Sequence, residues 1–546
     1  MTLFPDPASL PLDRLVAQLF VVRASGHLFD GQIRYPAWEP NRAALETLIH
    51  DRGIGGVLLI DGSAPEVALR TQELQAQAAI PLLICADIEE GVGQRFAGAS
   101  HLPPLMAIGA IAREDRDLAI HLARDMGRVT AREALAIGID WLLGPVVDVN
   151  NNPDNPVINV RSFSADPAIV ADLAAAFIHG AQDYPVLTTA KHFPGHGDTS
   201  VDSHWELPTI GHDRDRLAAV ELPPFERAIA AGVDAVMTAH VRVPTWDTQN
   251  PATLSPAISS GILRDQLGFD GIIATDALVM GAIAREYSNE AAILGAVQAG
   301  ADVVLMPEDA IGGIEAVCRA VEAGEISRDR IEASVSRLFA AKAKLTAQRQ
   351  TVSAATLRQQ LVTPEAIDLD HQILKASIVC GGSLPIAPIA STQASQTRSP
   401  RNVIILDDLL RCSVLGHHRA AVAVPQQHGY DLLCLDSQSF RDPDLTPESG
   451  AIVLQVFVRG NPFGSSADLA AKAQRWLEAA IACDRLAGLI VYGSPYALDQ
   501  FRATFPAPEA VPFVFSFSQT PAAQILAMEH LFGSGSMQWS GFKPNA

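Results

Sequence analysis

The densest group of residues able to do chemistry lies between positions 191 and 208. The segment reads KHFPGHGDTSVDSHWELP, and its glycines and prolines exclude a helix, so we expect a long loop. Its ionisable residues are Lys191, His192, His196, Asp198, Asp202 and His204. Such a loop is compatible with metal ligation, with acid/base catalysis or with a merely solvated surface. The absence of HxH and HExxH spacings from the segment disfavours a metal.

Asp202 stands two residues before His204. In extended or turn backbone the two side chains can meet, and the carboxylate would fix the tautomer of the imidazole and raise its basicity. A histidine held in this way can donate a proton to a leaving oxygen and later activate water. That reaction needs a nucleophile on the opposite side, and Asp276, near the end of the apolar run GIIATDAL, is the candidate.

The elements that would position these residues are short apolar runs that alternate with longer, Ala-rich amphipathic stretches over the first 345 residues. The alternation predicts βα units and a parallel sheet that is buried on both faces. Eight strands are predicted, at residues 15–22, 55–61, 81–87, 141–149, 186–193, 234–240, 271–278 and 301–306. Eight such units favour a (β/α)₈ TIM-type barrel, and an open doubly wound sheet is the alternative.

Charged or imidazole side chains end five of these apolar runs. They are Asp87, Asp148, Lys191 with His192, His240, and Asp276. A helix cap or a local ion pair explains any one of them as well as catalysis does. In a barrel, however, the carboxyl ends of all strands share one face, so five together favour a site there.

The composition changes after the predicted barrel. Residues 346–400 begin as a polar helical segment and end in a Ser/Thr/Pro/Gln-rich loop or linker at 391–400. Residues 401–546 again alternate strands, such as RNVIILDD and AIVLQVFV, with helices. We therefore predict a catalytic barrel over 1–345, a connecting segment over 346–400 and a smaller C-terminal α/β domain over 401–546. The last has no Gly-rich phosphate loop, so the chemistry is assigned to the barrel.

The formal net charge of −21, from 61 acidic and 40 basic residues, disfavours nucleic acid and anionic membranes as partners. The N-terminus has no basic region before its apolar stretch, and no apolar run approaches the ~20 residues of a membrane span, so we expect a cytoplasmic protein. The six cysteines form no CxxC pair and are interpreted as structural thiols.

Four segments, ADIEEGVGQRF, GPVVDVNNNPDNPVINVRSF, KHFPGHGDTSVDSH and IIATDALVM, resemble glycoside hydrolase family 3. They are most similar to its bacterial β-N-acetylglucosaminidase branch, which is known for peptidoglycan turnover. The resemblance covers residues 10–345, and a weaker similarity continues in the C-terminal segment 519–544.

The resemblance implies a retaining, exo-acting β-N-acetylhexosaminidase that releases terminal β-linked GlcNAc and needs no cofactor or metal. It implies that Asp276 is the nucleophile and forms a covalent glycosyl-enzyme, and that His204, paired with Asp202, is the acid/base. The residues implied to hold the sugar are Asp87, Arg95, Arg161, Lys191 and His192. The implied substrate is a β-N-acetylglucosaminide, either a muropeptide or a chitooligosaccharide.

This sequence departs from the family's usual E-G-G, which here reads Glu89-Glu90-Gly91. The change is expected to affect the subsite beyond the first sugar more than the first sugar itself. An imidazole acid/base, with an ordinary pKa of about 6.5, predicts a pH optimum near neutrality. It also leaves room for an anionic acceptor, so a phosphorylase is an alternative, as is a β-glucosidase. A non-catalytic sugar-binding barrel is the alternative from a different class.

Overall fold

The structure is a computed structural model that describes residues 4–346, 353–387, 399–459 and 466–533. The chain divides into two compact units, Met1–Leu369 and Asp370–Ala546. Almost all of the linker predicted at 391–400, and the last part of the C-terminal similarity, lie outside the described residues.

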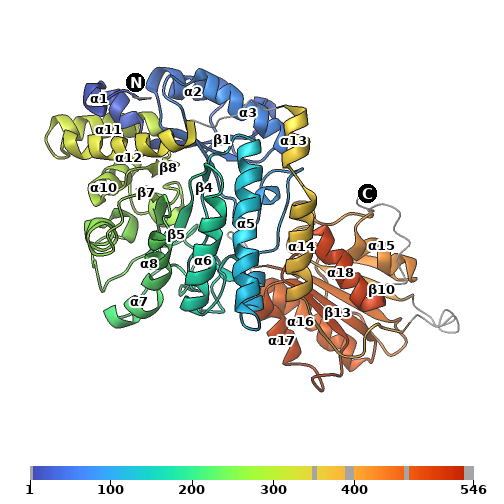
Figure 1. Ribbon diagram of the computed structural model, residues 1–546. Helices are drawn as coiled ribbons and strands as arrows, with labels where there is room; N and C mark the ends of the chain where they lie inside the picture. The colour runs from blue at the N-terminus through green and yellow to red at the C-terminus, as the bar shows by residue number, and fades with distance from the viewer. Residues whose placement is uncertain (1–3, 347–352, 388–398, 460–465, 534–546) are drawn as a thin grey trace. The chain divides into compact units, whose positions relative to one another are not determined.

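Unit 1 contains a ring of parallel strands, several of which are labelled in Figure 1. Its strands are β1 (Phe20–Ser25), β2 (Gly56–Ile60), β3 (Leu83–Ala86), β4 (Trp141–Leu142), β5 (Thr189–Phe193), β6 (Ala235–Thr238), β7 (Ile272–Thr275) and β8 (Val304–Leu305). Hydrogen bonds join them in the orders β4-β3-β2-β1-β8 and β5-β6-β7. Parallel bridges between Trp141 and Leu187 and between Ala274 and Val303 join the two sheets at both ends. The ring is therefore closed, and the predicted (β/α)₈ barrel is confirmed.

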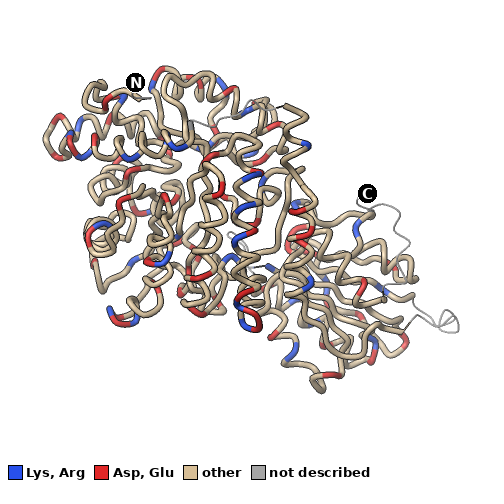
Figure 2. Tube along the Cα trace, in the orientation of Figure 1, with Lys and Arg blue, Asp and Glu red and all other residues tan. Residues whose placement is uncertain are grey.

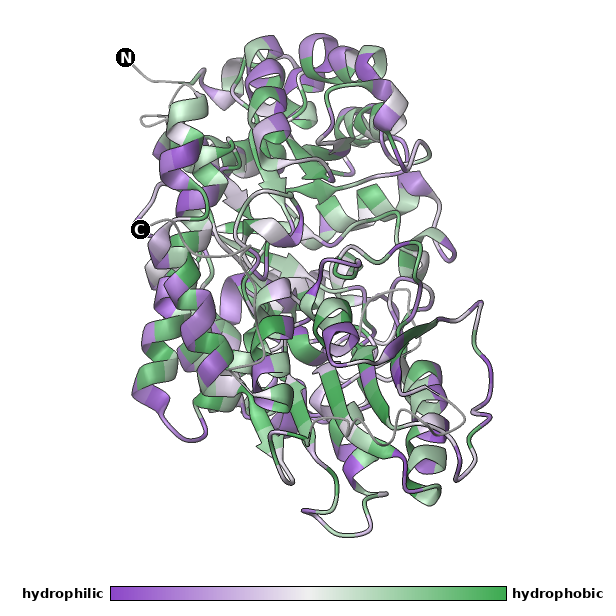
Figure 3. Ribbon diagram, turned by 90° about the vertical axis from the view of Figure 1, so that its right-hand side faces the viewer, coloured by the Kyte–Doolittle hydropathy of each residue, from purple (hydrophilic) through white to green (hydrophobic). Residues whose placement is uncertain are grey.

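Alternating side chains fill the inside and the outside of the barrel, as the two-residue period of a strand requires. Val21, Leu58 and Cys85 belong to one buried cluster, which takes residues from β1, β2, β3, β4, β6, β7 and β8 and from helix α12. Val22 and Leu59, one residue further along, belong to the cluster between strands and helices. In Figure 3 many of the strands are accordingly coloured hydrophobic over much of their length.

The helices of unit 1 surround the strands. In chain order, the α-helices and the π-helix η7 are α1 (Leu12–Ala17), α2 (Arg42–Glu46), α3 (Ala64–Gln77), α4 (Leu105–Ile111), α5 (Arg116–Ala136), α6 (Pro167–Ala181), α7 (Arg214–Val220), α8 (Leu222–Ala230), η7 (Ala257–Gln266), α9 (Gly281–Ala284), α10 (Asn289–Ala299), α11 (Ala310–Glu322) and α12 (Arg328–Thr346). Several of the helices in Figure 3 carry both hydrophilic and hydrophobic residues. Two further helices, α13 (Ala354–Gln360) and α14 (Pro364–Ser377), lie in the segment predicted to connect the domains.

The predicted bounds differ most from the observed ones in two strands. Residues 15–17 belong to helix α1, and β1 begins only at Phe20. A continuous apolar run does not distinguish a buried helix from a strand, and this run contains both. The strand predicted at 141–149 ends at Leu142, because Pro145 has no N–H to continue the ladder.

Unit 2 is a smaller α/β unit, as predicted. Its sheet has the order β11-β10-β12-β13-β14-β9 and is parallel except for the edge strand β9, which the sequence analysis missed. The strands are β9 (Val379–Gly381), β10 (Arg401–Ile405), β11 (Asp431–Leu435), β12 (Ile452–Val458), β13 (Leu486–Gly493) and β14 (Phe513–Ser516). The helices are α15 (Ala420–Gln427), α16 (Ser466–Ala482), α17 (Pro495–Arg502) and α18 (Pro521–Phe532).

Acidic and basic residues are interspersed along the helices and loops of both units (Figure 2). None of the helices in the described ranges has the length and hydrophobicity of a membrane span. All six cysteines are free thiols.

A buried carboxylate, that of Asp302 just before β8, joins several elements where the barrel closes. One of its oxygens accepts from Arg264 of η7 at 2.6 Å and from the Ile273 N–H of β7 at 3.0 Å. The other accepts from Ser334 at 2.6 Å and Arg337 at 3.1 Å, both in α12. One side chain thus ties the last strand to the preceding strand and to two helices.

We predict that Asp302→Ala lowers the free energy of unfolding by about 3 kcal/mol, because it leaves arginines without their buried partner. Urea unfolding followed by circular dichroism measures the change. The exposed Asp265, on the same helix as Arg264, serves as a control, and Asp265→Ala should stay within about 0.5 kcal/mol of the wild type. Equal stability of the two variants would contradict the role assigned to Asp302.

Candidate active site

The polar residues that end five of the predicted apolar runs lie at one rim of the barrel. Asp87 follows β3, Asp148 follows the short β4, and Lys191 lies within β5. His240 and Asp276 follow β6 and β7. Because all eight strands are parallel, these positions share the carboxyl end of the barrel, where enzymes of this fold carry their sites.

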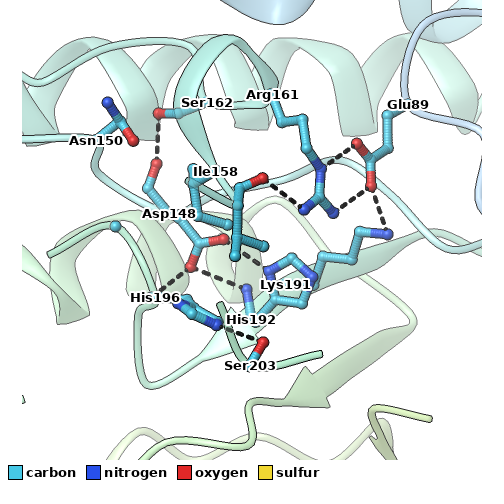
Figure 4. A network of polar contacts seen from close by, with 12 residues as sticks. Glu89, Asp148, Asn150, Ile158, Arg161, Ser162, Lys191, His192, His196 and Ser203 are labelled. Atoms are coloured by element: carbon cyan, nitrogen blue, oxygen red, sulfur yellow. Dashed lines mark hydrogen bonds and ion pairs between the residues drawn. The ribbon is translucent and has the colours of Figure 1, made fainter. Parts of the chain in front are cut away.

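Glu89 is the centre of a buried ion-pair cluster at this rim (Figure 4). Its carboxylate accepts two hydrogen bonds from Arg161, both of 2.8 Å. Lys191 Nζ lies 2.7 Å from Glu89 and 2.8 Å from Asp87. The sequence analysis named Asp87, Arg161 and Lys191 as sugar-binding residues and the structure brings them together, but it missed Glu89, which joins them.

Every member of this cluster is held in its charged form. Burial raises the pKa of Glu89, but the charges of Arg161 and Lys191 outweigh it and hold that pKa well below the ordinary value. Burial lowers the pKa of Lys191, but Asp87 and Glu89 raise it above its ordinary value. The pKa of Asp87 is lowered for the corresponding reason: Lys191 and Arg95 outweigh its burial. Two cations therefore face two anions, and the cluster as a whole is neutral.

A second buried carboxylate, that of Asp148, orients His192. It lies 2.7 Å from His192 Nδ1 and accepts the His192 backbone N–H at 3.1 Å. It also accepts the His196 N–H at 2.7 Å, which fixes the start of the following loop. Since a carboxylate only accepts, His192 carries its proton on Nδ1 and its Nε2 is left for another partner.

Asp276 is partly exposed at the rim and is surrounded by imidazoles. Burial raises its pKa, but His192, His240, the Ala277 N–H and His204 outweigh burial and lower the pKa to about 2. The N–H of Ala277 donates to its Oδ1 at 2.8 Å. His240 is fixed beside it, with Nε2 3.0 Å from the Ala277 carbonyl and Nδ1 2.8 Å from Thr253. Asp276 is thus an ionised carboxylate at neutral pH.

The 194–207 loop carries Asp202 and His204, whose side chains meet as the spacing predicts. Asp202 Oδ1 lies 2.8 Å from His204 Nδ1 and also accepts the His204 backbone N–H at 2.8 Å. The loop is fastened to the segment after Asp276, because the N–H of Gly281 donates to the His204 carbonyl at 3.0 Å and that of Ala282 to the Ser203 carbonyl at 3.2 Å. A Cβ at Gly281 would lie 2.7 Å from the His204 oxygen.

The remaining polar residues of the loop have partners other than a metal. His196 contacts Thr199 and Ser203, both at 2.9 Å, and burial is the main cause that lowers its pKa to about 4. Asp198 pairs with His212 at 2.7 Å. In the part of the chain that the structure describes, no group of three His, Cys, Asp or Glu side chains is arranged to hold a metal.

Two residues of the 87–96 loop differ from the expectation. Arg95 is exposed, and its Nε donates to the Asp87 backbone carbonyl at 2.8 Å rather than joining the Glu89 cluster. Glu90, the departure from the family pattern, is buried, and its Oε2 lies 3.5 Å from His101 Nε2.

Two family models match the chain. That of the glycosyl hydrolase family 3 N-terminal domain matches residues 11–341, and that of the bacterial glycosyl hydrolase family 3 C-terminal domain matches residues 393–533. The chain belongs to glycoside hydrolase family 3. It is a glycoside hydrolase, and the resemblance found in the sequence is confirmed.

Among curated proteins, β-hexosaminidase A of Pseudoalteromonas piscicida is 31% identical over 440 residues, which cover 74% of this chain and 70% of that protein. A β-hexosaminidase of Stenotrophomonas maltophilia (strain R551-3) is 39% identical over 263 residues, covering 47% and 77%. Among solved structures, a family 3 β-N-acetylglucosaminidase from Paenibacillus sp. str. FPU-7 is 30% identical, with a TM-score of 0.76 and 97% of each chain covered.

We predict that Glu89→Gln lowers kcat/KM about 100-fold, because Lys191 and Arg161 lose the charge that positions them. The same loss of a buried partner should reduce the free energy of unfolding by about 3 kcal/mol. Steady-state kinetics and urea unfolding measure the two effects. Glu90→Gln changes the neighbouring carboxylate, which faces the partly exposed His101, and its kcat/KM should fall less than about tenfold. Similar losses in both variants would show that Glu89 has no special role.

Proposed function

We propose that the protein is a retaining, exo-acting β-N-acetylhexosaminidase that releases terminal β-linked GlcNAc. The single observation that carries the proposal is the pairing of an ionised Asp276 with an Asp202–His204 dyad, fastened through Gly281 to the segment after Asp276. The preference for an N-acetylated sugar is supported by the names of the relatives, β-hexosaminidases and a β-N-acetylglucosaminidase.

In the first step, Asp276 attacks the anomeric carbon of the terminal sugar. The bond between that carbon and the leaving oxygen breaks, its electron pair stays with the oxygen, and His204 Nε2 donates the proton that the oxygen takes up. The product is a glycosyl ester of Asp276 and a free aglycone. Asp202, on Nδ1, stabilises the imidazolium that donates this proton.

In the second step, His204, now neutral at Nε2, takes a proton from water as the water oxygen attacks the same carbon. The ester bond breaks, the Asp276 carboxylate is restored, and His204 regains its proton. Two displacements at one carbon retain the β configuration. A phosphate ion could replace the water, because the imidazole adds no negative charge beside the ester.

The Glu89 cluster suits a neutral sugar. Asp87 and Lys191 present an acceptor and donors of opposite charge 2.8 Å apart at the rim, and sugar hydroxyls can both donate and accept. Charge-assisted hydrogen bonds of this kind are stronger than neutral ones. We propose that Asp87, Lys191, His192 and Arg161 hold the terminal sugar, with Arg95 acting through the Asp87 backbone.

The decisive experiment compares hydrolysis of 4-nitrophenyl β-N-acetylglucosaminide with that of the β-glucoside. We expect the wild type to prefer the acetamido substrate, Asp276→Ala to lose about 10⁴-fold in kcat and His204→Ala about 10²-fold or more. His50→Ala, at an exposed site remote in sequence, is the control and should match the wild type. Preference for the glucoside, or an active Asp276→Ala, would overturn the assignment. Glycosyl phosphate as the main product in phosphate buffer would identify a phosphorylase.

The pH dependence gives a separate prediction. The pKa of Asp276 is lowered to about 2, so its carboxylate is present above that pH and is lost only as the pH falls through about 2. The Asp276 ionisation should therefore add no acid limb to kcat/KM above about pH 4. The pH profile of kcat/KM, measured with an aryl leaving group for the wild type and for His204→Ala, checks this prediction. An acid limb above about pH 4 that persists in His204→Ala would contradict it.

A further inference from the structure

A cavity of about 460 Å³ lies at the same rim as Asp276. The loops that follow β1 and β8 line it, together with Val279, three residues after Asp276. Strands β7, β8 and β1 are consecutive in the ring, whereas β5, which carries Lys191, lies on the other side of β7. The cavity is therefore beside Asp276, on the side away from the Glu89 cluster.

The loop after β1 supplies an exposed aromatic surface to this cavity. The Trp38 side chain lines it and keeps 42% of its area exposed. The ring stacks on Tyr35 with centroids 6.0 Å apart, and the Arg23 guanidinium lies 5.6 Å from it. These contacts hold Trp38 in place and leave the rest of its side chain exposed. An exposed, rigid aromatic ring of this kind suits the apolar C–H face of a sugar.

Glu39 adds a hydrogen-bond acceptor that lacks a partner. The residue is 2% exposed and lines the cavity. Its Oε1 accepts from Arg23 Nε at 3.0 Å and from Nη2 at 2.7 Å. Its Oε2 is buried and has no hydrogen-bond partner among the residues that the structure describes. A buried acceptor left unpaired is costly, so this oxygen is suited to a hydroxyl or amide N–H of a ligand.

The charges that line the cavity discriminate between ligands. Arg23 is matched by Glu39, while Glu308 and Asp309 are both exposed on the loop after β8 and leave an excess of negative charge. A carboxylate in this cavity would be repelled. A muropeptide carries carboxylates on its muramic acid and its peptide, whereas a chitooligosaccharide is neutral.

We propose that this cavity is the subsite for the sugar next to the cleaved bond, and that it selects a neutral N-acetylglucosamine residue. The substrate class is then a chitooligosaccharide rather than a muropeptide. The inference rests on the proposed function, since it presupposes cleavage at Asp276. Trp38 contacts a face of the second sugar, and Glu39 Oε2 accepts a hydrogen bond from one of its hydroxyls or from its acetamido N–H.

Trp38→Ala tests the subsite with two substrates. For N,N′-diacetylchitobiose, kcat/KM should fall about fivefold or more with the loss of the aromatic contact. For 4-nitrophenyl β-N-acetylglucosaminide, which has no second sugar, it should change less than about twofold. Phe29→Ala, in the same loop but outside the cavity, removes an even more exposed aromatic and should leave both substrates unaffected.

Glu308→Lys tests the charge, independently of the aromatic contact. The wild type should cleave N,N′-diacetylchitobiose faster than the disaccharide GlcNAc-β-1,4-MurNAc. In Glu308→Lys the ratio of the two kcat/KM values should shift about threefold toward the anionic substrate at low salt, and less at high salt.

The outcomes separate the two proposals. Failure of the wild type to hydrolyse the 4-nitrophenyl substrate would defeat the proposed function. If that substrate is hydrolysed, equal kcat/KM values of the wild type and Trp38→Ala on diacetylchitobiose would overturn the subsite. Wild-type preference for the muramic acid disaccharide, or a ratio unmoved by Glu308→Lys, would overturn its selectivity for a neutral sugar.

Discussion

The burial of Glu89 between two cations is the interaction on which the rim of the barrel depends. A carboxylate with this little exposure is stable only if its charge is matched and its oxygens are hydrogen-bonded, and Arg161 and Lys191 do both. The three residues come from the loop after β3, the segment after β4 and strand β5. Because each of these buried charges needs its partner, the cluster fixes three neighbouring parts of the rim relative to one another before any substrate is present.

The other site residues are held in place by hydrogen bonds outside this cluster. Asp148 fixes His192 and the start of the 194–207 loop through its two oxygens. That loop reaches the segment after Asp276 through backbone hydrogen bonds to Gly281 and Ala282. The reacting groups are thus positioned largely by buried charge and main chain, with few flexible side chains between them. The cavity beside Trp38 lies outside this arrangement and is built from loops of β8 and β1.

Much of this arrangement could be predicted from the sequence. Asp87, Lys191 and Asp276 stand at the ends of apolar runs. This pattern predicted that they lie at one rim of the barrel, because parallel strands bring their carboxyl ends together. The i to i+2 spacing of Asp202 and His204 was sufficient to predict their contact, since it depends only on local backbone. Barrel closure was not visible in periodicity, because it depends on the bridges between β4 and β5 and between β7 and β8.

The failures have equally specific causes. Glu89 was noted only as part of an altered E-G-G pattern, although it stands three residues past the end of the buried strand β3, next to the polar residues that were named. The start of β1 was misplaced because a helix and a strand share one apolar run. Trp38 and Glu39 stand in a loop of ordinary composition, and only the fold shows that they line a cavity.

Gly281 shows how a residue without a side chain can constrain a catalytic site. Its N–H and its lack of a Cβ let the loop of the proposed acid/base approach to van der Waals contact, where the His204 and Trp205 oxygens would lie 2.7 and 2.9 Å from an added methyl group. The solvent-facing residues of the loop can therefore be substituted without disturbing this contact, whereas any side chain at Gly281 would disturb it. In a library of random variants, the inactive members should include replacements here even though the residue offers the substrate no functional group at all.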